Sequence, residues 1–264
     1  MHTQLCTYII GKSIITGASA GIGEACAREF AKTGANLVLT ARRIDRLNQL
    51  KTELQSHYPS ATVHCVQLDV RDDASVAACV DALPESVRDV SVLINNAGMV
   101  VGLDRTEVVP ASDVDRMIDT NIRGPLNLVR AILPGMRERQ AGHIINVGSI
   151  AGIEAYAGGS VYCATKHALN AITQVLRHEL MDTPIRVSEI KPGLVNTEFS
   201  TVRFGGDKAR ADKVYEGLTP LSAQDIAEIA AFIATRPPHV QIADLLVLAT
   251  DQAAATKAHR RSAH

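Results

Sequence analysis

The stretch Thr16-Gly17-Ala18-Ser19-Ala20-Gly21-Ile22-Gly23 decides how this chain begins to fold. An apolar run of strand length, residues 12–16, leads into it, and a segment of helical period, residues 21–33, follows. Glycine adopts the backbone angles that a tight turn requires and lets neighbouring backbone approach closely. The stretch therefore predicts a glycine-rich turn between the first strand and the first helix of a βαβ unit.

The same alternation of short apolar runs and longer helical segments continues along the 264 residues. The expected strands are residues 12–16, 36–41, 62–68, 90–95, 143–148, 186–191 and 244–248. The expected helices are residues 21–33, 44–58, 74–83, 112–140, 161–181 and 223–235. Strands that alternate with helices form a parallel sheet covered on both faces. We therefore predict a Rossmann-type doubly wound α/β fold with seven strands.

No linker, repeat or low-complexity tract divides the sequence, so residues 1–264 are expected to form a single domain. One long stretch, residues 193–221, does not fit the alternation of strands and helices. A loop of that length in a compact domain is usually a functional lid or partly disordered, and we expect this one to form a lid over a substrate. The residues after Asp251, which include Lys257, Arg260 and Arg261, are expected to be a solvated end.

The composition argues against several classes of protein. Lys and Arg total 27 against 28 Asp and Glu, which gives a net charge of -1 and no broad basic surface for nucleic acid or an anionic membrane. Five cysteines without C-x-x-C spacing argue against a disulfide framework or a metal site and favour a reducing, cytoplasmic compartment. The first eleven residues lack a signal-peptide pattern, and no apolar run reaches the roughly 18 residues that span a bilayer, so a soluble protein is expected.

The glycine-rich turn has the properties of an anion site. Its small residues let the backbone approach a pyrophosphate, and the free N–H groups at the start of the helix favour negative charge. Packing alone also produces such turns, and the T-G-x-x-x-G-x-G spacing differs from the commoner G-x-G-x-x-G. Its place after the first strand favours a dinucleotide site. The residues expected to contact the dinucleotide here are Gly17, Ser19, Gly21, Ile22 and Gly23.

The end of the second expected strand indicates which dinucleotide would bind. A ribose-binding carboxylate is expected there in an enzyme that uses NAD, but the chain has Ala41-Arg42-Arg43. Guanidinium groups bind a 2′-phosphate through charge-assisted, often bidentate hydrogen bonds. The alternative is a solvated helix start, although cations are disfavoured at a helix N-terminus without an anion. We therefore expect Arg42 and Arg43 to select NADP(H) as the cofactor.

Two further polar segments follow expected strands. Asp69-Val70 comes after the third strand, and Asn95-Asn96-Ala97-Gly98 comes after the fourth. The carboxyl ends of parallel strands meet at the edge where open α/β sheets bind ligands, so both segments are candidates for cofactor contact. Asp69 could equally cap the helix that begins near Asp72, and the two asparagines could equally form a turn.

Ser149, Tyr162 and Lys166 form the pattern that points most directly to chemistry. Within the expected helix 161–181, Tyr162 and Lys166 stand one turn apart on the same face. An ammonium beside a phenol favours the phenolate, so Tyr162 could exchange a proton as a general acid or base. Ser149 follows the fifth strand at the same sheet edge, where its hydroxyl could hold a substrate carbonyl or alcohol. A Tyr-x-x-x-Lys pair alone is common on amphipathic helices, whereas the pair with Ser149 and the glycine-rich turn is specific.

The chain resembles the short-chain dehydrogenase/reductase family from Lys12 to about Gln252. The matching parts are residues 16–23, 95–98, Asn121, Ser149, Tyr162 to Lys166, and Pro192-Gly193 followed by Thr197. The resemblance implies that Asn121, otherwise a polar residue that bends a helix, helps to hold a proton-relay water near Lys166. It further implies that Asp69 contacts the adenine, that Asn95 lies along the cofactor, and that Val195 and Thr197 contact the nicotinamide amide. It also implies a homotetramer.

A narrower resemblance is to the NADP-dependent 3-hydroxy acid dehydrogenases, also called serine or L-allo-threonine dehydrogenases. It is carried by residues 67–70, 131–136, 156–162 and 192–204. It implies hydride transfer between NADP(H) and the C3 hydroxyl or carbonyl of a small 3-hydroxy acid such as serine, L-allo-threonine or 3-hydroxybutyrate. The alternatives are a broad carbonyl reductase for ketones or β-keto esters and a non-catalytic nicotinamide sensor. A membrane-associated sterol or retinoid reductase would need a hydrophobic anchor that the sequence lacks.

Arg203 is the candidate for recognition of the acid. A lid that closes over a 3-hydroxy acid buries a carboxylate, which costs free energy unless a cation closes with it. Arg203 lies within residues 199–204, and a guanidinium matches a carboxylate in bidentate geometry. The alternative is a surface arginine in a mobile loop. Substrate contacts are therefore predicted for Ser149, Tyr162 and Arg203.

Overall fold

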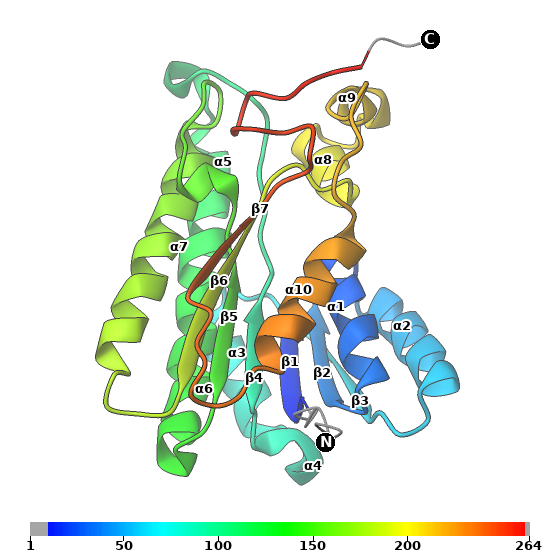
Figure 1. Ribbon diagram of the computed structural model, residues 1–264, viewed down its shortest axis with the longest axis vertical. Helices are drawn as coiled ribbons and strands as arrows, with labels where there is room; N and C mark the ends of the chain where they lie inside the picture. Colours follow the sequence, from blue (N-terminus) through cyan, green and yellow to red (C-terminus); the bar gives the residue numbers. More distant parts are fainter. Residues whose placement is uncertain (1–9, 262–264) are drawn as a thin grey trace, which may run out of the picture.

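The computed structural model describes residues 10–261, which form one parallel β-sheet with helices on both faces (Figure 1). Its seven strands are β1 (Lys12–Thr16), β2 (Asn36–Ala41), β3 (Val63–Gln67), β4 (Val92–Asn95), β5 (His143–Val147), β6 (Arg186–Pro192) and β7 (Asp244–Val247). The sheet order is β3-β2-β1-β4-β5-β6-β7, and all neighbouring pairs are parallel. The predicted seven-stranded Rossmann-type fold is confirmed, with strand ends within two residues of those expected. Cys6 and most of the stretch considered for a signal peptide lie outside the described residues.

Two layers of helices cover the sheet (Figure 1). One layer contains α1 (Gly21–Lys32), α2 (Ile44–His57) and α10 (Ala223–Ala234); the other contains α3 (Asp73–Asp81), α6 (Gly124–Arg139) and α7 (Ser160–Glu179). The short helix α4 (Glu85–Arg88) precedes β4, and the 3-10 turns η1 (Thr106–Val108) and η3 (Ile150–Gly152) follow β4 and β5. Because both faces are covered, all five residues of β5 are buried, as in other parallel sheets. Within residues 10–261, no helix is long and apolar enough to cross a membrane.

The helix expected over residues 112–140 is interrupted in the structure. α5 (Ala111–Ile118) and α6 are joined by η2 (Asp119–Arg123), a π-helical turn. The side chain of Asn121 projects from this turn, accepts a hydrogen bond from the Met99 N–H and donates one to the Met99 carbonyl, each at 2.8 Å. Helical periodicity could not predict the turn, because the contact that it makes is with a segment 22 residues away.

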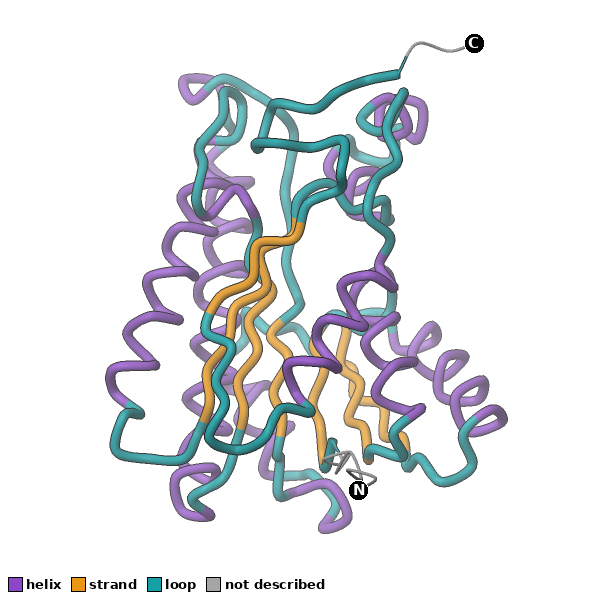
Figure 2. The backbone as a smooth tube through the Cα atoms, in the orientation of Figure 1, coloured by secondary structure: helices purple, strands orange, loops and turns teal. Residues whose placement is uncertain are grey.

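The segment of residues 193–221 contains two short helices that the sequence did not predict, α8 (Glu198–Arg203) and α9 (Lys208–Lys213). Each begins at a capping side chain: Thr197 accepts a hydrogen bond from a backbone N–H at 3.3 Å, and Asp207 accepts one at 3.0 Å. A parallel bridge between Val195 and Leu221 brings the two ends of the segment together. The segment is thus an excursion beyond the carboxyl ends of the strands that is closed at its base (Figure 2).

The described part of the carboxy-terminal tail contacts this segment, while Lys257, Arg260 and Arg261 are exposed, as expected of a solvated end. Arg260 donates hydrogen bonds to the carbonyls of Val214 and Glu216, just after α9, and Arg261 pairs with Asp251 at 3.1 Å. Carbonyl groups at a helix C-terminus lack intrahelical partners, which is why a guanidinium binds there. In Figure 1 the red tail runs across the top of the molecule to α9.

Candidate active site

The strand order reverses between β1 and β4, and the glycine-rich turn lies at this reversal, beyond the carboxyl end of β1. Open α/β sheets bind ligands at such a point. Gly17 and Gly21 have φ angles of +67° and +58°, which residues with a Cβ atom rarely adopt. Helix α1 begins after Ala20 without a capping side chain, so the N–H groups of its first turn are available to an anion.

Asn96 holds the shape of this turn from the neighbouring strand. Its side-chain amide donates to the Thr16 carbonyl at 2.8 Å, and the Thr16 hydroxyl accepts the N–H groups of Asn96 and Ala97 at 3.0 and 2.9 Å. A Cβ atom at Gly23 would collide with the carbonyl of Gly17, so only glycine allows this packing. Ile22 packs against the core that α1 and α10 share. The sequence predicts either cofactor contact or a turn for residues 95–98; it does not predict the hydrogen bonds of Asn96 to the glycine-rich turn.

Arg43 is exposed at the start of α2 and lies beside the glycine-rich turn. Its Nε donates to the Ser19 hydroxyl at 3.2 Å, and its Nη1 pairs with Glu198 of α8 at 3.0 Å. Arg42 is exposed, and its charge contributes to lowering the pKa of Asp69. Both guanidinium groups therefore lie at the binding edge, and Glu198 is a partner that the sequence analysis did not anticipate.

Asp69 is bound by a neighbouring arginine and does not cap a helix. Its carboxylate accepts hydrogen bonds from Arg71, from Nε at 2.9 Å and from the backbone N–H at 3.1 Å. The Arg71 guanidinium holds the pKa of Asp69 below its ordinary value. Helix α3 is capped by Asp72 instead. The Val70 carbonyl accepts a hydrogen bond at 3.0 Å from the buried Asn127, which the sequence analysis did not single out.

Asn121 and Lys166 approach the same small residue, Gly98. A Cβ atom at Gly98 would lie 3.5 Å from Asn121 Oδ1 and 3.7 Å from Lys166 Nζ. The Asn121 amide also donates to Thr165 Oγ1 at 3.0 Å, next to Lys166 in helix α7. Asn95, at the end of β4, donates a hydrogen bond to Asn146 Oδ1 on the neighbouring strand β5 at 3.0 Å. The structure thus brings Asn121 and Lys166 together, while the side chain of Asn95 is engaged in the sheet.

Ser149, Tyr162 and Lys166 lie in one buried cluster. The Lys166 Nζ atom lies 5.9 Å from the centre of the Tyr162 ring and donates to the Val147 carbonyl at 2.9 Å. Burial raises the pKa of Tyr162 above its ordinary value, and hydrogen bonding with the Ser149 hydroxyl acts in the opposite direction. Burial also lowers the pKa of Lys166 to about 8. Burial thus disfavours the charged form of both groups.

The 193–221 segment contacts the glycine-rich turn. A Cβ atom at Gly21 would lie 3.3 Å from the Cβ of Thr197, the residue that caps the start of α8. Pro192 ends β6, and Gly193 follows it where a Cβ atom would collide with the buried side chain of Gln252. These residues and Val195, at the bridge to Leu221, place the start of the segment directly beside the candidate anion site.

Arg203, at the end of α8, lies close enough to the buried cluster for its charge to act on Tyr162. Its Nη2 donates to the Tyr156 hydroxyl at 3.1 Å, and its Nε donates to the Gly102 carbonyl at 3.0 Å. Its positive charge acts on Tyr162, where it partly offsets the effect of burial on the pKa. Arg203 is therefore half-buried and held by named partners, unlike a surface arginine in a mobile loop. Tyr156, its partner, is a residue whose role the sequence analysis did not identify.

The geometry of the turn fits the phosphates of a dinucleotide. It combines two glycines at positive φ, a helix start without a capping side chain and a guanidinium beside Ser19. Within residues 10–261, no group of three or more His, Cys, Asp or Glu side chains could hold a metal ion. A tyrosine, a lysine and a serine beside a dinucleotide site can move a proton while a bound cofactor takes up or releases a hydride.

Comparison with known proteins agrees with this arrangement. A model of the short chain dehydrogenases matches residues 12–206. An NADP-dependent 3-hydroxy acid dehydrogenase of Schizosaccharomyces pombe is 47% identical over 255 residues, 96% of this chain and 98% of that protein. A sulfoacetaldehyde reductase of Chromohalobacter salexigens is 46% identical over 240 residues, 90% of this chain and 94% of that protein.

A solved structure of the closed form of serine dehydrogenase with NADP+ is similar throughout, with a TM-score of 0.89 and 40% identity. The similarity covers 95% of this chain and 99% of the other. These matches confirm the resemblance to the short-chain dehydrogenase/reductase family that the sequence motifs indicated. The chain belongs to the short-chain dehydrogenase family.

Proposed function

We propose that this enzyme transfers a hydride between NADP(H) and the C3 hydroxyl or carbonyl of a small 3-hydroxy acid. The observation that carries the proposal is the buried cluster of Ser149, Tyr162 and Lys166, in which the Arg203 charge acts on Tyr162. The names of the S. pombe relative and of the serine dehydrogenase structure, both similar along nearly the whole chain, support the same reaction class and the same cofactor.

The cofactor would bind along the carboxyl edge of β1, β2, β4 and β6. When bound, its nicotinamide accepts or supplies the hydride. The Arg43 guanidinium, held at Ser19, is placed to bind a 2′-phosphate with Arg42. The residues proposed to hold the cofactor, besides Tyr162 and Lys166, are Gly17, Ser19, Gly21, Ile22, Gly23, Arg42, Arg43, Asp69, Val70, Asn95, Ala97, Gly98, Pro192, Gly193, Val195 and Thr197.

Proton transfer is assigned to the buried tyrosine. Tyr162 takes the proton from the substrate alcohol in oxidation and returns it to the carbonyl in reduction. Because burial raises its pKa, Tyr162 needs the nearby Lys166 ammonium to stabilise its phenolate. Ser149 orients the reacting oxygen. Asn121 bonds the Met99 backbone and Thr165, the residue before Lys166, and supports the relay that would exchange the Lys166 proton.

Arg203 and the 193–221 segment are proposed to recognise the acid. The segment acts as a lid whose base is closed by the bridge between Val195 and Leu221. Arg203 enters the site from this lid, and the Tyr156 hydroxyl holds its guanidinium. A substrate carboxylate could therefore be buried with a cation beside it, which reduces the cost of its desolvation.

The sulfoacetaldehyde reductase relatives favour a second candidate, the reduction of a small anionic aldehyde. Arg203 would serve a sulfonate as well as a carboxylate, because both are anions that accept hydrogen bonds. The broad carbonyl reductase differs from both candidates, since its ketones and esters carry no charge for Arg203 to recognise.

A substrate comparison tests the proposal. The purified enzyme would be assayed for NADPH formation with 3-hydroxybutyrate, L-allo-threonine and L-serine, and for NADPH consumption with sulfoacetaldehyde and with uncharged β-keto esters. We expect the highest kcat/KM for one of the 3-hydroxy acids and little turnover of the esters. Preference for sulfoacetaldehyde would favour the second candidate, and preference for the esters would contradict both.

We also propose a cytoplasmic homotetramer that acts on its small-molecule substrate without a nucleic-acid or membrane partner. The exposed apolar side chains of Val175 and Met181, on α7 and just after it, support an interface there. Light scattering after size exclusion would test the assembly, and a monomer at micromolar concentration would contradict it.

A further inference from the structure

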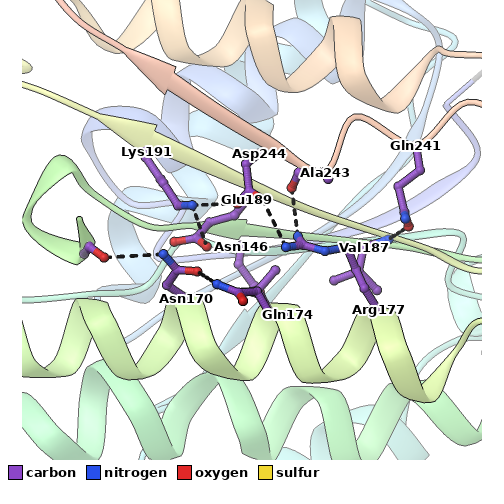
Figure 3. A network of polar contacts seen from close by, with 12 residues as sticks. Asn146, Asn170, Gln174, Arg177, Val187, Glu189, Lys191, Gln241, Ala243 and Asp244 are labelled. Carbon is purple, nitrogen blue, oxygen red and sulfur yellow. Dashed lines mark hydrogen bonds and ion pairs between the residues drawn. The ribbon is translucent and has the colours of Figure 1, made fainter.

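Glu189 is a fully buried carboxyl group that the proposed reaction has not yet used. It lies on β6, the strand that packs against helix α7, and has a relative exposure of 0% (Figure 3). Within the described residues neither of its carboxyl oxygens has a hydrogen-bond partner; its nearest cation, Lys191 on the same strand, lies 3.6 Å away. A buried carboxylate in this state costs free energy unless other positive charge is near.

The cation on its own strand is already engaged elsewhere. Lys191 Nζ lies 2.6 Å from Asp244 on β7, and Asp244 pairs in turn with Arg177 of α7 at 3.0 Å (Figure 3). Asp244 is partly exposed, so this chain of charges runs from Glu189 to the edge of the sheet. Lys191 therefore compensates Glu189 only in part.

On the other side, Glu189 and Lys166 contact the same peptide group. The Lys166 ammonium donates to the Val147 carbonyl at 2.9 Å, and a Cβ atom at the next residue, Gly148, would collide with the Glu189 carboxyl. This peptide leads directly to Ser149. The Glu189 carboxyl group thus lies behind the end of β5. This end leads to Ser149, and its Val147 carbonyl accepts the hydrogen bond from Lys166.

The charges of the two residues act on each other. Burial raises the pKa of Glu189 to about 7; Lys191 and then Lys166 oppose this effect, while Asp244 adds to it. In return, the Glu189 charge raises the pKa of Lys166, which burial lowers to about 8. Glu189 therefore ionises in the range of pH in which Lys166 would otherwise begin to lose its proton.

We propose that Glu189 is a positioning residue for Lys166: its buried carboxylate, behind the Val147–Gly148 peptide, keeps the lysine charged and directed toward Tyr162. The proposal rests on the proposed function, in which the Lys166 ammonium stabilises the phenolate. The structural alternative is that Glu189 serves only as a partner for Lys191 within the sheet.

The Glu189→Gln variant tests this through its pH profile. Without the carboxylate, the pKa of Lys166 should fall by about one unit, the effect of one nearby charge. In NADP-dependent oxidation, kcat/KM should then be lower than in the unmodified enzyme by up to about tenfold above pH 8, where Lys166 loses its proton early. Below pH 6 the two profiles should converge, because Glu189 is then protonated in the unmodified enzyme as well. Glu179→Gln, at the exposed end of α7, is the matched control.

A constant ratio of the two rates at every pH would show a purely structural role and overturn the proposal, as would identical profiles. Absence of NADP-dependent activity in the unmodified enzyme would instead contradict the proposed function. Nuclear magnetic resonance of Cε-labelled lysine in the cofactor-free protein gives a readout independent of turnover. The Lys166 signal, assigned by its loss in Lys166→Met, should titrate at lower pH in Glu189→Gln, and an unchanged titration would contradict the proposal.

Lys191→Met provides a second test if the Gln variant does not fold. Removing Lys191 leaves Glu189 intact but takes away the cation that most lowers its pKa, so Glu189 should ionise at higher pH. The activity of Lys191→Met should then fall below that of the unmodified enzyme near pH 7 and recover as pH rises further. A deficit that does not depend on pH would contradict the role assigned to Glu189.

Discussion

Arg43 and Glu198 form an ion pair of 3.0 Å that joins the start of α2 to helix α8. Because Arg43 also bonds Ser19 in the glycine-rich turn, an anion arriving beside Ser19 would compete with Glu198 for the same guanidinium. Under the proposed function this anion is the 2′-phosphate of NADP. Cofactor choice and the placement of α8 are therefore linked through one arginine.

Removing this arginine and its neighbour should change cofactor preference. The Arg42→Ala, Arg43→Ala double variant should bind NADP more weakly by about 2 to 4 kcal/mol, the scale of lost charge-assisted hydrogen bonds, and NAD almost as well as before. Isothermal titration with both cofactors at the same ionic strength measures the difference. An equal loss for NADP and NAD would contradict the assignment.

Glu198→Gln is the matched control, and it should change the affinity for NADP in the opposite direction. It removes a negative charge that pairs with Arg43 and with Arg46, at 3.0 and 2.6 Å, and leaves both arginines in place. NADP should bind several-fold more tightly than to the unmodified enzyme, and more so at low salt because the site is exposed. Weaker NADP binding would show that Glu198 organises the site instead of competing for it.

Tyr162→Phe should abolish turnover while leaving cofactor binding nearly intact. The substitution removes the proton donor, a group that contributes about 10²- to 10⁴-fold to rate, but keeps the ring that packs against Phe199. Steady-state kinetics and fluorescence titration with NADPH separate the two effects. Tyr58→Phe, after the end of α2, is the control. A kcat above about a tenth of the original would rule out Tyr162 as the general acid and base.

Arg203→Ala should raise KM for a 3-hydroxy acid and spare uncharged alcohols. The expected loss is about 1.5 to 3 kcal/mol in kcat/KM, as for a hydrogen bond to a charged group. The control is Arg210→Ala, since Arg210 lies in the same segment but stacks over the Phe204 ring, 4.7 Å from its centre. Equal effects on charged and uncharged substrates would mean that Arg203 shapes the lid without recognising the acid.

His143 predicts how the fold responds to acid. Burial, with a smaller effect of the Arg186 charge, lowers the pKa of His143 to about 3 from an ordinary 6.5. Between these values the unfolded chain binds a proton that the folded protein does not, so stability must fall as pH falls from 6.5 toward 3. The contribution at the acid end is up to about 5 kcal/mol.

His143→Gln should make the free energy of unfolding less dependent on pH in this range. Urea unfolding followed by circular dichroism at pH 6.5 and pH 4 measures the dependence. His178→Gln, an exposed histidine near the end of α7, should behave like the unmodified protein. The same pH dependence in all three proteins would contradict the burial argument.

The sequence predicts the strands well because each is a short apolar run that must be buried on both faces. The sequence predicts local structure poorly where contacts with distant segments determine the backbone conformation. The π-helical turn at Asn121 forms where that side chain meets Met99, and helices α8 and α9 are shorter than a periodic pattern can reveal. The charge of the tail predicted its exposure but could not predict that Arg260 donates hydrogen bonds to carbonyl groups after α9.

The candidate site shows the same division. Spacing along one helix was enough to place Tyr162 and Lys166 together, and strand order was enough to bring Ser149 to the same edge. Pairings between distant segments, such as Arg203 with Tyr156 or Glu189 behind Gly148, depend on the register of the whole sheet and on the path of the lid. No local pattern in the sequence encodes them.

Transfer of an isotope tests the central claim most directly. The enzyme would be incubated with NADP+ and the 3-hydroxy acid that the substrate comparison favours, carrying deuterium at C3, and the NADPH formed would be isolated for nuclear magnetic resonance. Direct hydride transfer predicts one deuterium at C4 of the nicotinamide and none in Tyr162→Phe, which should form no NADPH above background. NADPH without deuterium, or no NADPH from the unmodified enzyme, would contradict the claim that this chain oxidises a 3-hydroxy acid at C3.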